Sequence, residues 1–256
     1  MLANYHTHTA RCMHATGEDE EYVLAAIEAG YTTLGFSDHA PFYYPNDYVS
    51  FYKMTSDKLM GYADSVRSLT EKYKGKIDIH LGLEAEYFPE LFDEGLKLWK
   101  RCGINYLILG QHFVGREYDE TVHRAGWQSD EEILHRYINT CIAAIETGKF
   151  SYVAHPDMLN YVGSDSVYER EVLRLTECAM LHKTPLEVNL LGLYEGRTYP
   201  CERFWEIASR LKPEVIIGND AHTPLSFART STREAAVELL RKYGLTPLER
   251  LSFKPI

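Results

Sequence analysis

The sequence predicts an α/β protein built around one sheet of seven parallel strands. Its 256 residues alternate seven short β-type runs with longer segments of helical periodicity. Strands that alternate with helices are joined by crossovers and run parallel. The length is typical of a single α/β barrel. No GxGxxG or GKS/T loop follows any strand, which disfavours a nucleotide-binding sheet. The pattern by itself is compatible with a closed barrel and with an open doubly wound sheet.

The strands are expected where short runs of β-forming residues occur. These runs are LANYH, TLGFS, IDIHLGLE, YLILG, YVA, PLEVN and VIIG, at residues 2–6, 33–37, 77–84, 106–110, 152–154, 185–189 and 215–218. The third run also predicts an orientation, because Ile77, Ile79, Leu81 and Leu83 alternate with polar residues and glycine. We expect the apolar face to pack on the helices and the other face, with Glu84 at its end, to point into the barrel. His80 lies deeper on that inner face and is expected in the core.

The helices are expected between the strands, where apolar residues recur three or four positions apart. Their ranges are 18–29, 56–73, 89–101, 130–147, 168–182, 201–211 and 231–243. Thr16 is a candidate cap of the first helix, and Gly30 is a candidate stop. Residues 40–55 are rich in aromatic side chains and follow the second strand, so we expect a loop that covers a substrate.

Composition excludes some partners. The net charge of −10 argues against nucleic acid or an anionic membrane as a partner. None of the five cysteines forms a CxxC pair, which indicates free thiols in a reducing compartment. Neither a signal peptide nor an apolar run long enough to span a membrane is present. We therefore expect one cytoplasmic domain over residues 1–256. The sequence does not predict its oligomeric state.

Metal-capable side chains gather at the ends of six of the seven predicted strands. They are His6, His8, His14, Asp38, His39, Glu84, His112, His155, Asp220 and His222. Carboxyl ends of parallel strands meet at one edge, where active sites assemble. Residues two apart in an extended chain point the same way, so His6 and His8 face one centre, as do Asp220 and His222. Each pair alone is a weak motif, but the joint pattern is not.

Imidazoles with a few carboxylates suit Zn²⁺, Mn²⁺ or Fe²⁺ better than Ca²⁺ or Mg²⁺. The candidates are too many for one ion and suit two or three ions with a bridging carboxylate. Cys12 lies between His8 and His14 and is a weaker ligand candidate. Clustered divalent ions typically bind phosphate oxygens and stabilise an in-line displacement. The sequence therefore predicts a metallophosphatase.

The motifs HTHTARCMHA, GFSDHAPF, GLEAEY, GQH, AHPD, EVN and GNDAH resemble, in order and spacing, the PHP (polymerase and histidinol phosphatase) family. The likeness covers nearly the whole chain and is strongest to the stand-alone histidinol-phosphatase branch. It implies a distorted (β/α)7 barrel of TIM-barrel type with three metal ions at the carboxyl ends of the strands. The first ion would bind His6, His8, Glu84 and Asp220. The second would bind Glu84, His112 and His155, and the third His14, His39 and His222.

The resemblance implies hydrolysis of a small phosphorylated metabolite, L-histidinol phosphate, in histidine biosynthesis. We expect Glu84, Asp220, His222 and Asp38 in the catalytic set. Asp38 and Asp157 would orient ligand imidazoles or protonate the leaving group.

Arg116 and Arg197 follow strand ends and are candidates to bind the phosphate, with Arg11 a weaker one. Residues 42–52 and an acidic residue such as Glu86 or Asp47 are candidates to receive the rest of the substrate. Two alternatives stay open. One is a phosphoesterase for a nucleotide or sugar phosphate, and the other is a non-catalytic metal-binding protein.

Overall fold

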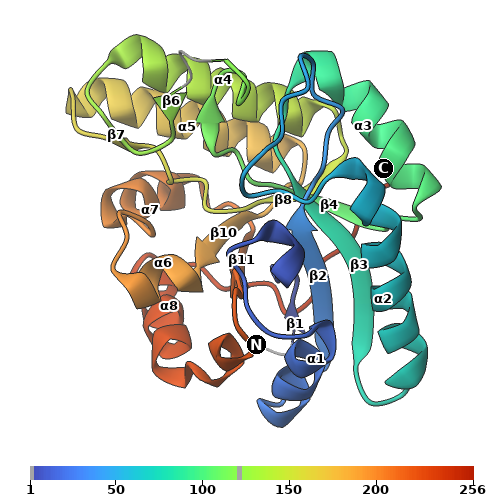
Figure 1. The fold of residues 1–256 in the computed structure, drawn as a ribbon. Coiled ribbons are helices and arrows are strands. Elements are labelled where there is room, and N and C mark those ends of the chain that lie inside the picture. Colours follow the sequence, from blue (N-terminus) through green and yellow to red (C-terminus); the bar gives the residue numbers. More distant parts are fainter. Residues whose placement is uncertain (1–2, 120–122) are drawn as a thin grey trace.

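The computed structural model describes residues 3–119 and 123–256, and its main feature is a barrel-shaped sheet of seven parallel strands (Figure 1). In spatial order the strands are β1 (Ala3–Asn4), β2 (Thr33–His39), β3 (Asp78–Ala85), β4 (Tyr106–Leu109), β8 (Phe150–Val153), β10 (Leu186–Asn189) and β11 (Val215–Gly218). Each overlaps a predicted strand, although residue 2 of the first prediction lies outside the described residues. The predicted α/β class and barrel are confirmed.

The first and last strands close the barrel just beyond their carboxyl ends. The His8 amide donates to the Ala221 carbonyl at 2.9 Å, and the Ala221 amide donates to the His6 carbonyl at 3.1 Å. The strand pairing on the opposite side of the barrel, around β8, is less regular. The β4–β8 pairing shifts register between Leu107 and Leu109, and β8 pairs with β10 at one position, Val153 with Leu186. The barrel is therefore distorted, as the family resemblance implies.

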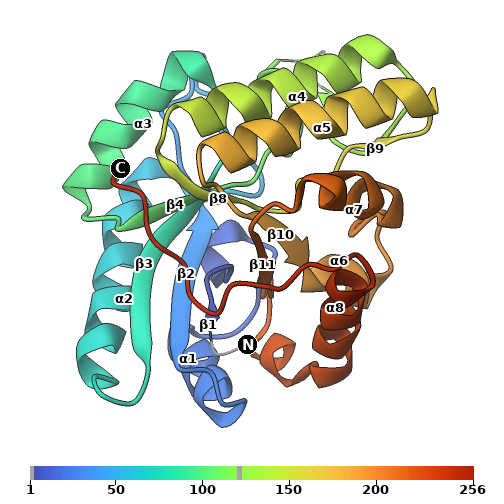
Figure 2. The same ribbon diagram turned by 180° about the vertical axis from the view of Figure 1, so that it is seen from behind.

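Helices surround the sheet (Figures 1 and 2). They are α1 (Asp19–Glu28), α2 (Leu59–Lys72), α3 (Pro89–Arg101), α4 (Glu131–Glu146), α5 (Asp165–Leu181), α6 (Leu190–Glu195), α7 (Glu202–Ala208) and α8 (Thr230–Lys242). Short 3₁₀ helices span Ala10–Cys12, Ser56–Lys58, Ser209–Leu211 and Pro224–Ala228. Two small ladders lie outside the barrel: β5 (Phe113–Val114) with β6 (His123–Arg124), and β7 (Trp127–Gln128) with β9 (Asn160–Tyr161).

Two helix predictions need correction. Thr16 does not cap α1; Glu18 occupies the N-cap position, and its amide donates to the Glu21 side chain at 2.7 Å. Helix α6 was not predicted, because six residues are too few for a periodic pattern. It begins directly after β10, where the Asn189 side chain accepts from the Gly192 amide at 2.9 Å. A side-chain cap of this kind stabilises a helix start.

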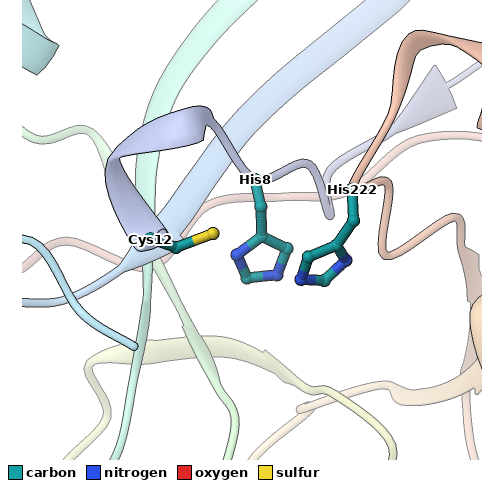
Figure 3. Close-up of side chains that lie close together, drawn as sticks. All are labelled: His8, Cys12 and His222. Carbon is teal, nitrogen blue, oxygen red and sulfur yellow. The ribbon is translucent and has the colours of Figure 1, made fainter. Parts of the chain in front are cut away.

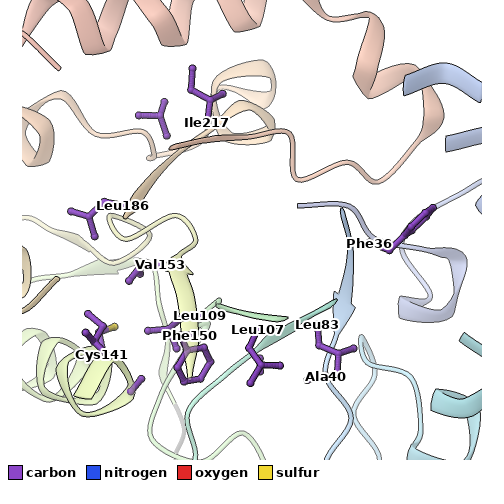
Figure 4. Packing of buried hydrophobic residues seen from close by; sticks show 14 of the residues in the cluster. Phe36, Ala40, Leu83, Leu107, Leu109, Cys141, Phe150, Val153, Leu186 and Ile217 are labelled. Carbon is purple, nitrogen blue, oxygen red and sulfur yellow. The ribbon is translucent and has the colours of Figure 1, made fainter. Parts of the chain in front are cut away.

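The core has two parts, which correspond to the two faces of the strands. Leu107 and Leu109 of β4 point outward into the large cluster that the helices cover (Figure 4). Tyr106 and Ile108, the alternating residues, point into the barrel with Tyr152. This alternation is the two-residue period of an extended strand. The predicted orientation of the third strand is confirmed, since Leu81 and Leu83 belong to the outer cluster.

The C-terminal segment covers the amino-terminal end of the barrel. Figure 2 shows it crossing the strands from α8 toward α3. Phe253 stacks on Tyr106 with ring centroids 4.6 Å apart and contacts Tyr5 and His80 edge-on. His80 therefore lies at the end of the barrel remote from the other inward histidines, deeper along the strand as predicted, but it is only partly buried. No helix in residues 3–119 and 123–256 is long and apolar enough to span a membrane.

Candidate metal centre

The nine predicted ligands lie together at the carboxyl end of the barrel. Eight of them line one pocket of about 560 Å³: His8, His14, His39, Glu84, His112, His155, Asp220 and His222. The ninth, His6, lies fully buried beneath them, with its Nε2 atom 3.5 Å from both Glu84 and Asp220. The sheet brings these residues together because parallel strands place their carboxyl ends at one edge.

Glu84 is the centre of this group. Its Oε1 atom lies 2.9 Å from His155 Nε2, 3.5 Å from His6 Nε2 and 3.7 Å from His112 Nε2. Its Oε2 atom lies 2.9 Å from His39 Nδ1 and 3.5 Å from His8 Nε2. One buried carboxylate thus faces five imidazoles, which is the arrangement expected of a bridging ligand.

Glycines leave room for the buried carboxylates. A Cβ atom built on Gly110, at the end of β4, would lie 1.9 Å from Glu84 Oε1. A Cβ atom built on Gly218, at the end of β11, would lie 1.8 Å from Glu187 Oε1. Real Cβ atoms essentially never approach other atoms within 3.0 Å. The two strand-end glycines are therefore needed for Glu84 and Glu187 to occupy their observed positions.

Asp220 is the second carboxylate of the centre. Its Oδ1 atom lies 3.1 Å from His8 Nε2 and 3.3 Å from His222 Nδ1. Its backbone is left-handed, with φ of 49°, and that of His155 has φ of 30°. Non-glycine residues rarely adopt such values, and they concentrate at functional sites. The backbone is thus strained at two predicted ligands.

A second group of imidazoles adjoins the Glu84 cluster through His39: His14, His39 and His222 have nitrogen atoms within 4.8 Å of one another. Figure 3 shows the His222 ring beside the His8 ring, stacked at 4.2 Å, with the Cys12 side chain directed toward His8. Cys12 is fully buried, and burial raises the pKa of its thiol to about 12. The thiolate, and not the thiol, is the form that binds metal, so the raised pKa makes Cys12 a poor ligand candidate.

The donor set fits divalent ions. Among the described residues, His6 Nε2 is buried without a hydrogen-bond partner, and so is Glu84 Oε2, whose 2.9 Å contact with His39 Nδ1 lacks hydrogen-bond geometry. Such atoms are costly to bury unless something binds them. Overlapping ligand groups include His6 with His8 and Glu84, and His39 with Glu84 and His112. Nitrogen with carboxylate oxygen is the donor chemistry of Zn²⁺, Mn²⁺ and Fe²⁺.

Acceptors behind the imidazoles fix their orientation. Glu187 Oε1 lies 2.8 Å from His6 Nδ1, and Glu86 Oε1 lies 2.9 Å from His112 Nδ1. Backbone carbonyls accept at the Nδ1 atoms of His14 and His222, at 2.7 and 2.9 Å. An acceptor at Nδ1 leaves Nε2 free to face the centre.

Two of these acceptors correct the expectations from sequence. Glu187 had no predicted role beyond its place in the EVN motif, although its alternation with Leu186 and Val188 would have indicated an inward side chain. Glu86 was a candidate to receive substrate. It is instead buried against His112, Tyr52 and Lys53, and it does not line the pocket.

The two aspartates that were expected to orient imidazoles, Asp38 and Asp157, make different contacts. Asp38 Oδ1 lies 3.6 Å from His8 Nδ1, an atom that makes no hydrogen bond among the described residues, and the Thr9 hydroxyl donates to Asp38 Oδ2. Asp157 Oδ2 instead accepts from the Cys201 amide at 2.6 Å, at the start of α7. It is buried outside the pocket lining, and burial raises its pKa to about 7. The amide at the start of α7 thus holds Oδ2, whereas Oδ1 has no hydrogen-bond partner among the described residues, and a role of Asp157 in orienting an imidazole stays a prediction.

The three candidate arginines lie in different places relative to the pocket. Arg197 lines the pocket, where it donates to the Tyr199 hydroxyl at 2.6 Å and pairs with Glu195 at 2.7 Å. Arg116 is not a pocket residue; its exposed guanidinium pairs with Glu90 at 2.5 Å. Arg11 pairs with Asp19 at 2.8 Å. The placement supports Arg197 alone among these three as a phosphate-binding candidate. The loop after β2 contributes Phe51 and Tyr52 to the pocket, as expected of a covering loop.

Electrostatics favour cations at the centre. Burial opposes ionisation of Glu84, but His112, His39 and His6 outweigh it and hold the Glu84 pKa well below its usual range. Burial and the neighbouring His8 lower the pKa of His222 to about 3. Burial lowers the pKa of His6 and His112, but the neighbouring carboxylates outweigh burial and raise both pKa values, so metal ions that bind these rings would displace protons.

The chain is similar to known proteins over most of its length. A family model of the PHP domain matches residues 4–191. A "Probable histidinol-phosphatase" of Deinococcus radiodurans is 29% identical over 233 residues, which cover 87% of both chains. The histidinol-phosphatase of Bacillus subtilis is 25% identical, with 85% of this chain and 92% of that protein covered.

The fold has solved counterparts. The histidinol phosphate phosphatase of Lactococcus lactis, crystallised with zinc, L-histidinol and phosphate, superposes with a TM-score of 0.71 at 19% identity. The match covers 98% of this chain and 97% of that one. At this identity the likeness establishes the fold.

Proposed function

Because the chain belongs to the PHP domain family, we propose that it is a metal-dependent phosphatase that hydrolyses L-histidinol phosphate to L-histidinol and phosphate. The observation that carries the proposal is the Glu84 carboxylate, which five imidazoles approach within 4 Å at the floor of an open pocket. The names of the relatives in Deinococcus and Bacillus support this substrate and a role in histidine biosynthesis. Residues 1–256 act as one domain in this proposal.

Three sets of side chains would hold the ions, and the first two sets share Glu84. His6, His8, Glu84 and Asp220 would bind the first ion, Glu84, His112 and His155 the second, and His14, His39 and His222 the third. Zn²⁺, Mn²⁺ or Fe²⁺ fits these donors. Such ions, when bound, neutralise phosphoryl oxygens and lower the pKa of a bound water. Glu187 and Glu86 fix the tautomers of His6 and His112, and the Asp38 carboxylate adds a negative charge 3.6 Å from His8 Nδ1.

The pocket residues hold the substrate. The Arg197 guanidinium lines the same pocket as Glu84, and a phosphate would bind it in place of Glu195, with which it pairs at 2.7 Å. Phe51, Tyr52 and Leu191 give the pocket an apolar wall for the organic part of the ester. A pocket of about 560 Å³ accommodates a small metabolite.

A substrate panel tests the proposal. Purified protein, depleted of metal and reloaded with Mn²⁺ or Zn²⁺, is assayed against histidinol phosphate, sugar phosphates and nucleotides by phosphate release. We expect kcat/KM to be highest for histidinol phosphate and to vanish on chelation. A higher kcat/KM for a sugar phosphate or a nucleotide would contradict histidinol phosphate as the substrate and would favour that ester. A chain that binds metal but hydrolyses none of the panel would contradict an enzymatic role.

A further inference from the structure

A buried lysine lies behind the candidate metal centre. Lys53 is 2% exposed and follows the aromatic loop that leaves β2. Its ammonium donates to Glu86 Oε2 at 3.1 Å, to the Tyr44 hydroxyl at 3.1 Å, and to Glu117. Glu86 and Glu117 are as buried as the lysine. One ammonium thus joins two carboxylates that come from different segments, one after β3 and one after β5.

The surroundings of Lys53 are aromatic. Its Nζ atom lies 4.8 to 5.8 Å from the ring centroids of Phe42, Tyr44, Tyr52 and Phe88. Cation–π contacts and two carboxylates offset part of the cost of burying a charge. Buried ion pairs nevertheless add little net stability compared with apolar residues of the same size. Stability alone therefore does not account for a lysine at this position.

Contacts run without a gap from Lys53 to a candidate ligand. Glu86 uses Oε2 for Lys53 and Oε1 for His112 Nδ1, at 2.9 Å. The Tyr52 hydroxyl also donates to Oε1, at 2.8 Å. His112 Nε2 then faces Glu84 Oε1 across 3.7 Å. With Lys53 in place, Glu86 cannot turn Oε1 away from His112 without also moving Oε2 away from the ammonium.

We propose that Lys53 is a positioning residue of the metal centre. It holds the Glu86 carboxylate against His112 and so aims the His112 Nε2 atom at the position shared with Glu84 and His155. Acceptors behind a ligating histidine typically change metal affinity by about 10- to 100-fold. This inference rests on the proposed metal centre and adds to it a residue that touches neither ion nor substrate.

Replacement of Lys53 tests the inference through metal binding. We expect Lys53→Met to weaken one of the bound Zn²⁺ ions by about 10- to 100-fold and to leave the others at wild-type affinity. The readout is Zn²⁺ per chain at buffered free Zn²⁺, with the fold checked by circular dichroism. Lys53→Met leaves two buried carboxylates without their cation, so Lys53→Met with Glu117→Gln is measured in parallel to keep the charge of the cluster. Arg174→Met is the matched control, because Arg174 pairs with buried Glu171 away from the centre.

A double-mutant cycle separates positioning from a general packing defect. If Lys53 acts through Glu86, Glu86→Gln alone causes the same loss of affinity, and adding Lys53→Met causes no further loss. Additive losses would overturn the inference, as would wild-type affinity for every ion in the folded Lys53→Met, Glu117→Gln protein. A wild-type chain that binds no Zn²⁺ would overturn the proposed metal centre as well, so the two failures are distinguishable.

Discussion

Gly110→Ala offers the sharpest test of the role of Glu84. The added Cβ atom would lie 1.9 Å from Glu84 Oε1, 2.4 Å from Cδ and 2.5 Å from Cγ. To restore even a 3.0 Å separation, the Oε1 atom must move by about 1.1 Å. Glu84 is buried among five imidazoles, so this movement breaks the approach to several of them. A misplacement of about 1 Å at a reacting centre costs on the order of 100-fold in rate.

The assay follows activity and metal content together. We expect kcat/KM of Gly110→Ala to fall by about 100-fold or more. The number of Zn²⁺ ions per chain, measured after dialysis against buffered Zn²⁺, should fall, because Glu84 is proposed to bind two of the ions. The ion of His14, His39 and His222 should be affected less, because among the described contacts only His39 of this set reaches Glu84, at 2.9 Å.

Gly61→Ala is the matched control. Gly61 lies on the exposed face of α2, where an added Cβ atom meets no other atom within 4 Å. Alanine is favoured over glycine in a helix by about 1 kcal/mol, so this variant should be at least as stable as the wild type and fully active. Normal metal content and activity in Gly110→Ala would refute the reasoning, since Glu84 would then tolerate a displacement that a bridging ligand cannot.

Three further outcomes are expected. Glu187→Gln should weaken metal binding by about 10- to 100-fold, because Glu187 orients His6; unchanged affinity in a chelator competition would contradict this. Arg197→Ala should raise KM for the phosphate ester by about 10-fold or more, whereas Arg116→Ala should leave it unchanged, and equal effects in steady-state kinetics would argue against the assignment. Burial disfavours protonation of His8, but Asp220 and Asp38 outweigh burial and raise its pKa to about 9. Metal binding at pH 7 should therefore release a proton from His8, and affinity should rise with pH up to about 9. Calorimetry in buffers of different ionisation enthalpy measures that release, and its absence would contradict the raised pKa.

Much of the barrel was predictable because its signals are local. The apolar runs VIIG and YLILG mark β11 and β4 without reference to any other part of the chain, and the alternation around Glu84 sets which face is buried. Helix α6 and the four short outer strands were not predicted, because two to six residues carry no period. The cap of α1 was assigned to Thr16 by residue type, whereas the glutamates at 18 and 21 form it.

The sequence by itself determined which residues are able to bind metal and that they gather at one edge, since strand parity and the carboxyl ends of parallel strands are properties of a linear pattern. Tertiary structure alone decided what stands behind each imidazole. Glu187, Glu86 and Lys53 meet His6 and His112 from other strands and loops, and no spacing along the chain encodes those contacts. The same holds for Arg116 and Arg197, which both follow strand ends in sequence. The direction in which each loop leaves its strand places one guanidinium in the pocket and the other on Glu90.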